Sequence, residues 1–333
     1  MSPGSPGHAD GEDGMRKFSE AALKKAILAH ETERLKHGSA LGASRSELGA
    51  LRKNRQAAEK ILSQFLRKSG LDLNALQELN EKRSAETRRL VERNKSDAIK
   101  LASRRKGASY SALAARSGTM RWQTQDFTLT NPFIIWSIPT IPGVEPAITP
   151  QGAMAKFKYT TSGFSGWQKV GFYYLWPNPY PDYAVIDVVT TLSATGYIQA
   201  HAPWGSFSEN NSKLTATSLL NLWIGWPGSD SVTSSSFYQQ GIGNVWAYAS
   251  LFDGWFHDTD GQSIASETYP WAGPFAVPPG ALVVFEVALE LDYSNDSGDV
   301  EADFESGDFN IACPGVSFAV LNNVFSPSAA RGT

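Results

Sequence analysis

Several features that would narrow the function of this chain are missing or scarce. One cysteine, Cys313, occurs in 333 residues, which excludes an intrachain disulfide and leaves packing to stabilise the fold. We expect it to be a small buried residue in a strand. The first fifteen residues lack the apolar core of a secretion signal, and no run of about 18 apolar residues could cross a membrane. We therefore expect cytoplasmic synthesis without a signal peptide and no membrane span, while a non-classical route of export or release stays open.

Tryptophan is absent from the first 120 residues, and basic residues are scarce after them. Residues 1–120 hold 24 Lys and Arg against 14 Asp and Glu, a net charge of +10. Residues 121–333 hold 6 against 19, a net charge of −13, together with all ten tryptophans. The overall charge of −3 conceals this contrast. The division predicts two domains with different roles.

The basic part has the apolar periodicity of helices. Residues 1–14 are mostly Gly, Pro, Ser and acidic residues, and we expect a disordered tail. Residues 15–106 are predicted to form a basic helical segment, which residues 107–120, rich in Gly, Ser and Ala, link to the second domain. Helices are expected at about 19–37, 44–70 and 73–105.

The third predicted helix is about 50 Å long at 1.5 Å per residue, yet it has few apolar residues. Such a helix either projects into solvent or is covered by another chain, so a solvated face and a self-association stalk are both open. Acidic residues interrupt its Lys and Arg residues, which argues against nucleic-acid binding. The densest basic cluster, a candidate basic interface, is Arg104, Arg105 and Lys106.

From residue 121 onward the period of the apolar pattern changes from 3.6 to 2. Nine or ten short strands with no helical stretch between them predict an all-β antiparallel sandwich, jelly-roll-like, over residues 121–328, with a short tail at 329–333. The expected fold class is therefore α+β with the two parts segregated, an N-terminal helical hairpin or long helix preceding the sandwich. The expected strand runs lie at about 125–137, 155–161, 167–176, 183–192, 216–226, 244–252, 282–293, 299–305 and 309–321.

One hairpin can be predicted in register. Along residues 281–292 the odd positions are apolar and several even positions are acidic, and the alternation recurs along residues 299–305. If the turn at residues 295–298 closes the pair symmetrically, the apolar faces coincide. The predicted opposite pairs are Leu291 and Val300, Leu289 and Ala302, and Val287 and Phe304.

The same register would place six carboxylates in like-charge pairs on the outer face: Asp292 with Asp299, Glu290 with Glu301, and Glu286 with Glu305. Like charges directly opposite destabilise a sheet by up to about 1 kcal/mol per pair. We therefore expect basic side chains of the helical segment, from the same chain or a neighbour, to cover this acidic interface. Its predicted members are Glu286, Glu290, Asp292, Asp299, Glu301, Asp303 and Glu305.

The sequence contains no convincing catalytic or metal-binding motif. Neither a Walker pattern nor a G-x-G-x-x-G after a strand occurs, so we predict no catalytic residue and no cofactor. His201 and His257 are 56 residues apart, and lone surface histidines are expected rather than a zinc site. Calcium is a minor alternative, either at the D-x-D-G fragment Asp258–Gly261 or along residues 292–303.

Aromatic residues are the remaining candidates for ligand contact, because several fall at expected strand ends or in Pro-rich loops. Flat rings at such places stack on sugar faces, although core packing is the alternative for each of them. The candidate aromatic platform consists of Trp176, Tyr180, Trp204, Trp223, Trp226, Trp255 and Trp271.

The architecture favours a non-enzymatic structural or assembly protein. In this interpretation the helical segment joins or anchors copies into a homo-oligomer or filament, and the sandwich is a building block or binding head. A lectin-like carbohydrate-binding module is the first alternative. A glycan-active enzyme is the second, with Asp258 and Asp260 beside Trp255 as its candidate carboxylates.

Overall fold

The computed structural model describes residues 25–30, 32–33, 60, 64, 67–68, 73–105, 125–138, 147–149, 152–160, 164–203, 210–226, 232–249 and 257–321. The two expected tails, the expected linker and most of the first two predicted helices lie outside these residues, so the helical hairpin stays an expectation. Helix α3 (Leu73–Arg105) spans the range of the third predicted helix. No helix in the described part of the chain is long and apolar enough to cross a membrane.

The described residues from 125 onward contain sixteen strands, whose pairings are all antiparallel. Sheet A has the order β1 (Gln125–Leu129), β16 (Val316–Leu321), β7 (Ala184–Thr190), β12 (Trp271–Val277). Sheet B has the order β10 (Val232–Ala249), β9 (Asn210–Gly225), β13 (Leu282–Asn295), β6 (Phe164–Pro177), β2 (Ile134–Ile138). Sheet C has the order β3 (Ala147–Thr149), β4 (Gly152–Met154), β15 (Asn310–Ala312), β8 (Leu192–His201), β14 (Asp299–Asp303), β5 (Lys156–Tyr159), with β11 (Thr259–Thr268) also paired to β8.

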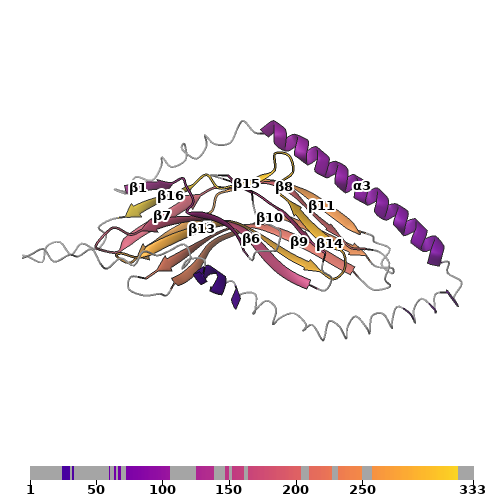
Figure 1. Ribbon diagram of the computed structural model, residues 1–333, viewed down its shortest axis with the longest axis horizontal. Coiled ribbons are helices and arrows are strands. Elements are labelled where there is room, and N and C mark those ends of the chain that lie inside the picture. The colour runs from indigo at the N-terminus through magenta and orange to yellow at the C-terminus, as the bar shows by residue number, and fades with distance from the viewer. Residues whose placement is uncertain are drawn as a thin grey trace, which may run out of the picture.

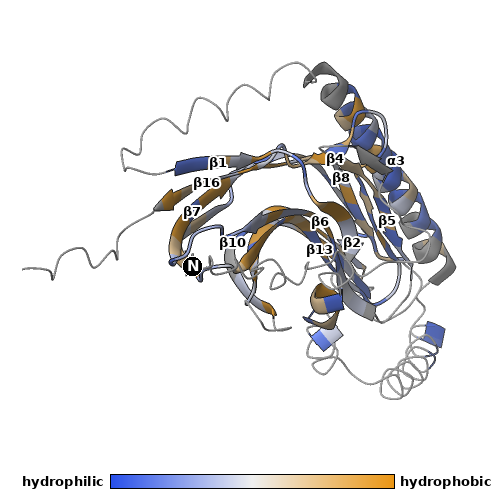
Figure 2. Cartoon of the chain, turned by 60° about the vertical axis from the view of Figure 1, so that its left-hand side comes forward, coloured by the Kyte–Doolittle hydropathy of each residue, from blue (hydrophilic) through white to orange (hydrophobic). Residues whose placement is uncertain are grey.

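The three sheets form two layers with the core between them. Sheet B makes one layer, and sheets A and C make the other (Figures 1 and 2). Buried side chains from all three sheets meet in one cluster, including Leu289 from sheet B, Val188 from sheet A and Ile198 from sheet C. An antiparallel sandwich-like class is therefore confirmed.

Strand β13 shows which part of the predicted hairpin was right. Its odd positions Val287, Leu289 and Leu291 all lie in the core, as do Val300 and the other two expected partners. They meet across the sandwich rather than side by side, because β13 pairs with β6 and β9 in sheet B whereas β14 pairs with β5 and β8 in sheet C.

The predicted hairpin register is therefore wrong, and the three like-charge pairs are not formed. The chain crosses between layers at residues 295–298. Asn295 Nδ2 donates to the Gly298 carbonyl oxygen at 2.9 Å, and the Asp296 N–H donates to the Asn211 carbonyl oxygen at 2.8 Å. Gly298 has a φ of 123° and passes so close to the backbone of His201 that a Cβ atom would lie 2.0 Å from its carbonyl oxygen. Alternation identifies a buried face, but it carries no information on which sheet the next strand joins.

The expected strand list missed several strands. Residues 125–137, expected as one run, form β1 and β2, while β3, β4, β11, β12 and most of β8 and β10 were not predicted. Apart from one alanine, the only hydrophobic residue of β11 is Ile264, and its side chain is buried. Such a strand is stabilised by its neighbours, here β8 on one side.

Helix α3 lies along the outer face of sheet C, against β11 and β8 (Figures 1 and 2). Val91 and Ala98, seven residues apart on one side of the helix, are buried together with Tyr197 and Phe309. The hydroxyl of Tyr197 donates to the backbone oxygen of Val91 at 3.2 Å. The polar helix thus has a short apolar strip facing the sheet.

Candidate functional site

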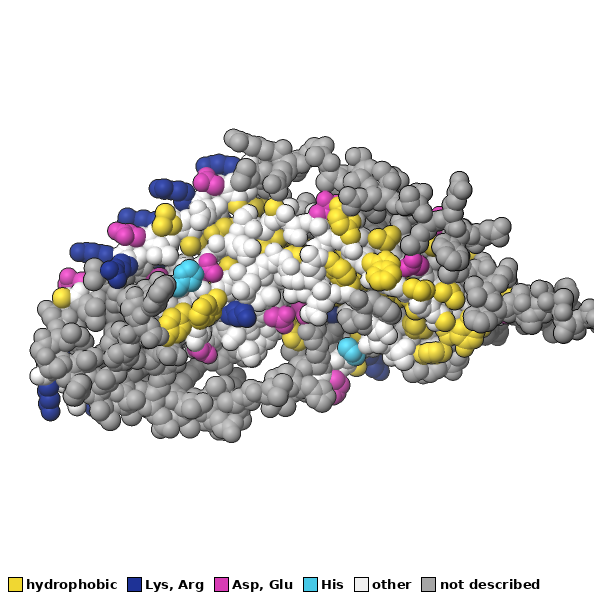
Figure 3. Space-filling model, turned by 180° about the vertical axis from the view of Figure 1, so that it is seen from behind, with side chains coloured by type: hydrophobic (Ala, Val, Ile, Leu, Met, Phe, Trp, Pro, Cys, Tyr) yellow, Lys and Arg dark blue, Asp and Glu magenta, His cyan; other side chains and the backbone are white. Residues whose placement is uncertain are grey.

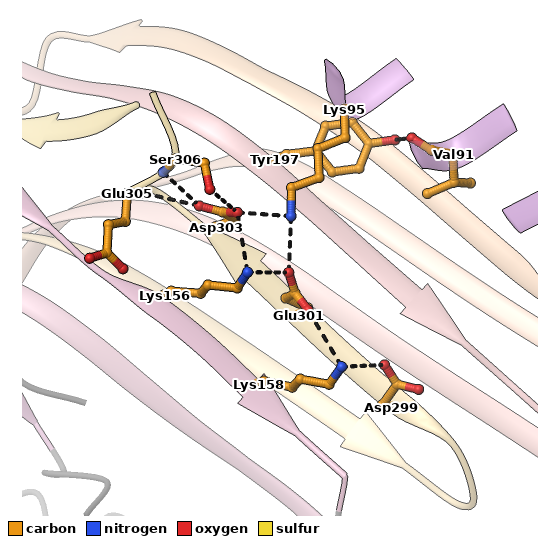
Figure 4. A network of polar contacts seen from close by, with 10 residues as sticks. All are labelled: Val91, Lys95, Lys156, Lys158, Tyr197, Asp299, Glu301, Asp303, Glu305 and Ser306. Carbon is orange, nitrogen blue, oxygen red and sulfur yellow. Dashed lines mark hydrogen bonds and ion pairs between the residues drawn. The ribbon is translucent and has the colours of Figure 1, made fainter. Parts of the chain in front are cut away.

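Six charged side chains meet where α3 crosses sheet C, and we call them the ion cluster (Figure 4). Lys95 of α3 places its Nζ 2.8 Å from Asp303 Oδ2 and 3.0 Å from Glu301 Oε1. Lys156 lies 3.2 Å from Glu301 and 3.6 Å from Asp303. Three carboxylates are thus matched by three ammonium groups. The members are Lys95, Lys156, Lys158, Asp299, Glu301 and Asp303.

Strand geometry explains the cluster. Val300 and Ala302 of β14 point into the core, so Asp299, Glu301 and Asp303 point the other way, toward α3. The neighbouring strand β5 pairs Lys158 with Glu301 and Lys156 with Asp303. Opposite charges directly across a strand pair stabilise it.

Burial and charge act in opposite directions on the pKa values of this cluster. Burial alone would raise the pKa of Asp303, but Lys95, the Ser306 hydroxyl and two backbone N–H groups hold it far below its usual range. The pKa of Glu301 is lowered in the same way, against the effect of burial, by Lys95 and Lys156. Burial would lower the pKa of Lys95, yet its two carboxylate partners raise it. All three groups therefore stay ionised at neutral pH.

A second polar contact ties α3 to the sheet. Arg88 Nη2 lies 2.5 Å from Nε2 of His201, whose Nδ1 lies 2.9 Å from the Asp258 carbonyl oxygen. Burial and the nearby Arg88 lower the pKa of His201. A neutral ring with Nδ1 protonated satisfies both contacts, since Nε2 then accepts from the guanidinium.

The outer face of sheet B carries a fully buried ion pair. Lys169 Nζ of β6 lies 2.5 Å from Glu286 Oε1 of β13, and both side chains are inaccessible to solvent. Glu286 also accepts hydrogen bonds from Tyr173, Asn221 and Trp223, at 3.0, 3.1 and 2.7 Å. Burial would raise the pKa of Glu286, but Lys169 and these donors lower it.

An N-terminal piece of the chain covers part of this face. Residues 25–30 are helical, and Ile27 is buried against Trp167, Tyr173, Trp223 and Val284. The ring of His30 meets Trp223 edge-on with centroids 5.0 Å apart. Both outer faces of the sandwich therefore contact basic, N-terminal parts of the chain.

The predicted acidic interface is thus divided between two layers and is not one exposed face. Glu286 and Glu290 are buried in sheet B, where Glu290 lies directly across from Lys169 in the strand register, and Asp292 beside them is half-buried. Three members belong to the ion cluster, and Glu305 is exposed. Of the predicted basic interface, the side chains of Arg104 and Arg105 and the whole of Lys106 lie outside the described residues.

Sequence reasoning missed the lysines that neutralise these acids. Residues 121–333 contain six basic residues, and Lys156, Lys158 and Lys169 among them all pair with carboxylates. Each lies within or beside an apolar strand run. A lysine within an apolar strand run could have predicted these pairs, because a buried ammonium group requires a carboxylate or another acceptor as its partner.

The structure does not bring together the described members of the predicted aromatic platform. Trp176 and Trp223 have exposed fractions of 5% and 2%, so these rings pack the interior, Trp176 against Phe127 and Phe318. Tyr180 is half-buried and donates to Gln125 at 2.6 Å. Trp204 and Trp255 lie outside the described residues. Trp176 and Trp223 are buried because they lie within strands β6 and β9, where their large apolar rings pack the interior, and not in loops.

Trp226 and Trp271 remain exposed, and Trp246, which was not predicted, joins them. Their exposed fractions are 40, 54 and 51%. Trp271 Nε1 donates to Asp187 Oδ1 at 3.0 Å, which orients the ring on the outer side of sheet A. Figure 3 shows hydrophobic side chains gathered toward the end of the molecule away from α3.

Both histidines contact the D-x-D-G fragment, His201 through the backbone oxygen of Asp258 and His257 through the Asp260 carboxylate. His257 Nε2 lies 3.5 Å from Asp260 Oδ1, while Asp260 accepts from the backbone N–H groups of Trp246 and Gly261 at 2.9 Å each. Asp258 is buried next to β11. Within the described ranges, no three His, Cys, Asp or Glu side chains group as metal ligands. Cys313 is buried, though it lies between β15 and β16 rather than in a strand, and burial raises the pKa of its thiol.

No protein-family model matches the chain, and no curated protein matches its sequence.

Replacing Lys95 with Met keeps most of the apolar stem and removes the ammonium group. We expect the free energy of unfolding to fall by about 1.5 to 3 kcal/mol, the usual contribution of hydrogen bonds to charged groups. Urea unfolding measures the loss, and faster amide hydrogen exchange along α3 would locate it. Lys82→Met, on the exposed side of the same helix, is the matched control. Equal stability of the two variants would show that the ion cluster does not hold the helix.

Acid should weaken the protein through Asp303 and Glu301. Their folded-state pKa values lie below the ordinary values of about 3.9 and 4.3, so the unfolded chain binds protons first as pH falls. The stabilisation is complete above about pH 5 and is lost as pH drops through the folded-state values. Asp303→Asn should be less stable at pH 7 and flatten the pH dependence of the unfolding free energy, and Asp182→Asn, an exposed site outside the ion cluster, is the matched control. If the unfolding free energy of Asp303→Asn depended on pH as steeply as that of the parent, Asp303 would not be a source of the acid sensitivity.

Proposed function

We propose that this is a non-enzymatic structural or assembly protein. The helical segment joins or anchors copies, and the jelly-roll-like sandwich is the building block or binding head. The ion cluster supports this proposal, because Lys95 of α3 pairs in it with Glu301 and Asp303 of β14 and so holds the helix on the sheet. A rigidly held helix can transmit a defined orientation from one copy to the next.

The single observation that carries the proposal is the bare outer side of α3. The helix is 33 residues long, and one strip of it, with Val91, Lys95 and Ala98, faces sheet C. The rest of the helix surface is mostly exposed along its described length and includes Leu90, whose exposed fraction is 55%. A polar helix with an exposed leucine on a rigid support suits contact with another chain.

The proposal predicts that the full-length protein has a mass in solution that is a multiple of 36.2 kDa. Sedimentation analysis over a range of protein and salt concentrations measures this mass. Electron microscopy of the same sample should show particles or filaments of regular form. A protein that stays monomeric up to tens of micromolar, at low and at physiological salt, would contradict it.

A lectin-like binding module is the second candidate, and the exposed ring of Trp271 supports it. The hydrogen bond from its Nε1 to Asp187 holds the ring in one orientation. A fixed flat ring beside a carboxylate offers one surface for a sugar face and one acceptor for a sugar hydroxyl. Exposed Trp246 on β10 differs, because its ring Nε1 donates to the amide oxygen of Asn211 at 3.0 Å, and only its backbone N–H donates to a carboxylate, that of Asp260.

If this second candidate holds, a glycan array should identify a ligand, and Trp271→Ala should weaken its binding by about tenfold without unfolding the sandwich. Titration calorimetry with that glycan measures the change. Trp246→Ala is the control, because it removes an equally exposed ring elsewhere. Equal affinities for the two variants, or an array with no ligand, would remove this candidate.

A further inference from the structure

The exposed side of α3 has a charge order that is complementary to itself. Five exposed residues follow one another at spacings of three and four, which places them along one side of the helix, beside the buried strip of Val91 and Ala98 and turned away from the sheet. In order they are Arg83, Glu86, Leu90, Arg93 and Asp97. Figure 3 shows basic and acidic side chains alternating along the edge of the molecule where α3 lies.

A two-fold axis through Leu90 brings opposite charges together. When two antiparallel copies of α3 are related by such an axis, a residue that precedes Leu90 by some number of positions faces the residue of the other copy that follows Leu90 by the same number. Arg83 and Asp97 each lie seven residues from Leu90, about 10.5 Å along the helix. Glu86 and Arg93 lie four and three residues away, a mismatch of about 1.5 Å that long side chains accommodate.

We propose that a second copy of this chain docks on α3 through this side, antiparallel and about a two-fold axis at Leu90. Leu90 then packs against the partner copy's Leu90. Arg83 faces Asp97, and Glu86 faces Arg93, each pair occurring twice by symmetry. The inference rests on the proposed function, and it names the partner and the contact within that function.

Charge order selects the antiparallel arrangement. A parallel pair in register would place every charge against its like, Arg83 on Arg83 and Asp97 on Asp97, which is repulsive. Lys100 Nζ already lies 3.2 Å from Asp97 Oδ1 within the same helix. This exposed contact is weak and leaves the second oxygen of Asp97 for the partner's arginine.

The contact is expected to be salt-sensitive. Among the described side chains of α3, Leu90 is the one large apolar residue with an exposed fraction above half. Exposed ion pairs are screened over roughly 8 Å at physiological ionic strength. Association through this face should therefore weaken as the salt concentration rises.

Charge reversal with rescue tests the arrangement. Arg83→Glu alone and Asp97→Arg alone each turn two attractive pairs into repulsive ones, and each should raise the dissociation constant of the full-length protein about tenfold. The double variant R83E/D97R should return it to within about threefold of the parent. Residues 83 and 97 are about 21 Å apart along one helix, so rescue cannot arise within a chain.

A disulfide test places the axis independently. Leu90→Cys should give a covalent dimer under mild oxidation, since a residue on the axis lies close to its own copy. Ser96→Cys is exposed on another side of α3 and should stay monomeric on a denaturing gel. The native Cys313 is buried and does not compete in the folded protein. Circular dichroism confirms that each variant is folded.

The outcomes separate this inference from the function it rests on. A parent that is monomeric under all conditions overturns both. If the parent assembles but the single variants associate as tightly as the parent does, the two-fold contact is wrong and the assembly function stands. The same holds if the double variant is not rescued and Leu90→Cys gives no covalent dimer. Rescue together with the Leu90→Cys dimer establishes the contact.

Discussion

The structure depends on the neutralisation of carboxylates that strand alternation places on the outer faces of the two layers. β13 and β14 each send apolar side chains into one core and acids to the other side. Glu286 meets Lys169 at 2.5 Å, and Asp303 meets Lys95 at 2.8 Å. An unpaired buried carboxylate would cost several kcal/mol, so each lysine position is constrained as tightly as a core residue.

The two ion pairs have different structural consequences. The Lys169–Glu286 pair lies within sheet B. Tyr173 donates to the same Glu286 oxygen as Lys169, and Asn221 and Trp223 donate to the other. Replacing such a pair by apolar groups is often neutral, whereas removing one partner is strongly destabilising because the other charge is then buried without a counter-charge. The ion cluster instead joins two elements far apart in sequence. It ties a polar helix to a sheet that offers it few apolar contacts, with Tyr197 and Phe309 among them.

Fixing α3 by its inner strip determines which residues face outward. Lys95 and Val91 fix the rotation of the helix, so Leu90 and its charged neighbours are presented together on a side that is turned away from the sheet. A helix free to rotate would not present a constant charge order to a partner. The same argument applies to Trp271, whose ring is oriented by Asp187. In both places a polar contact inside the molecule defines a surface that another molecule could recognise.

The sequence by itself determined the change from helix to strand periodicity, the range of α3 and the apolar face of β13, because these follow from the local periods of 3.6 and 2. It also determined that Val287, Leu289, Val300 and Ala302 share a core. Only the tertiary structure decided that β13 and β14 belong to different layers, that Trp176 and Trp223 are buried, and that Lys95 and Lys169 neutralise the acids. Those outcomes depend on contacts between residues up to about two hundred positions apart, and the pattern of a single strand is the same whichever partner it meets.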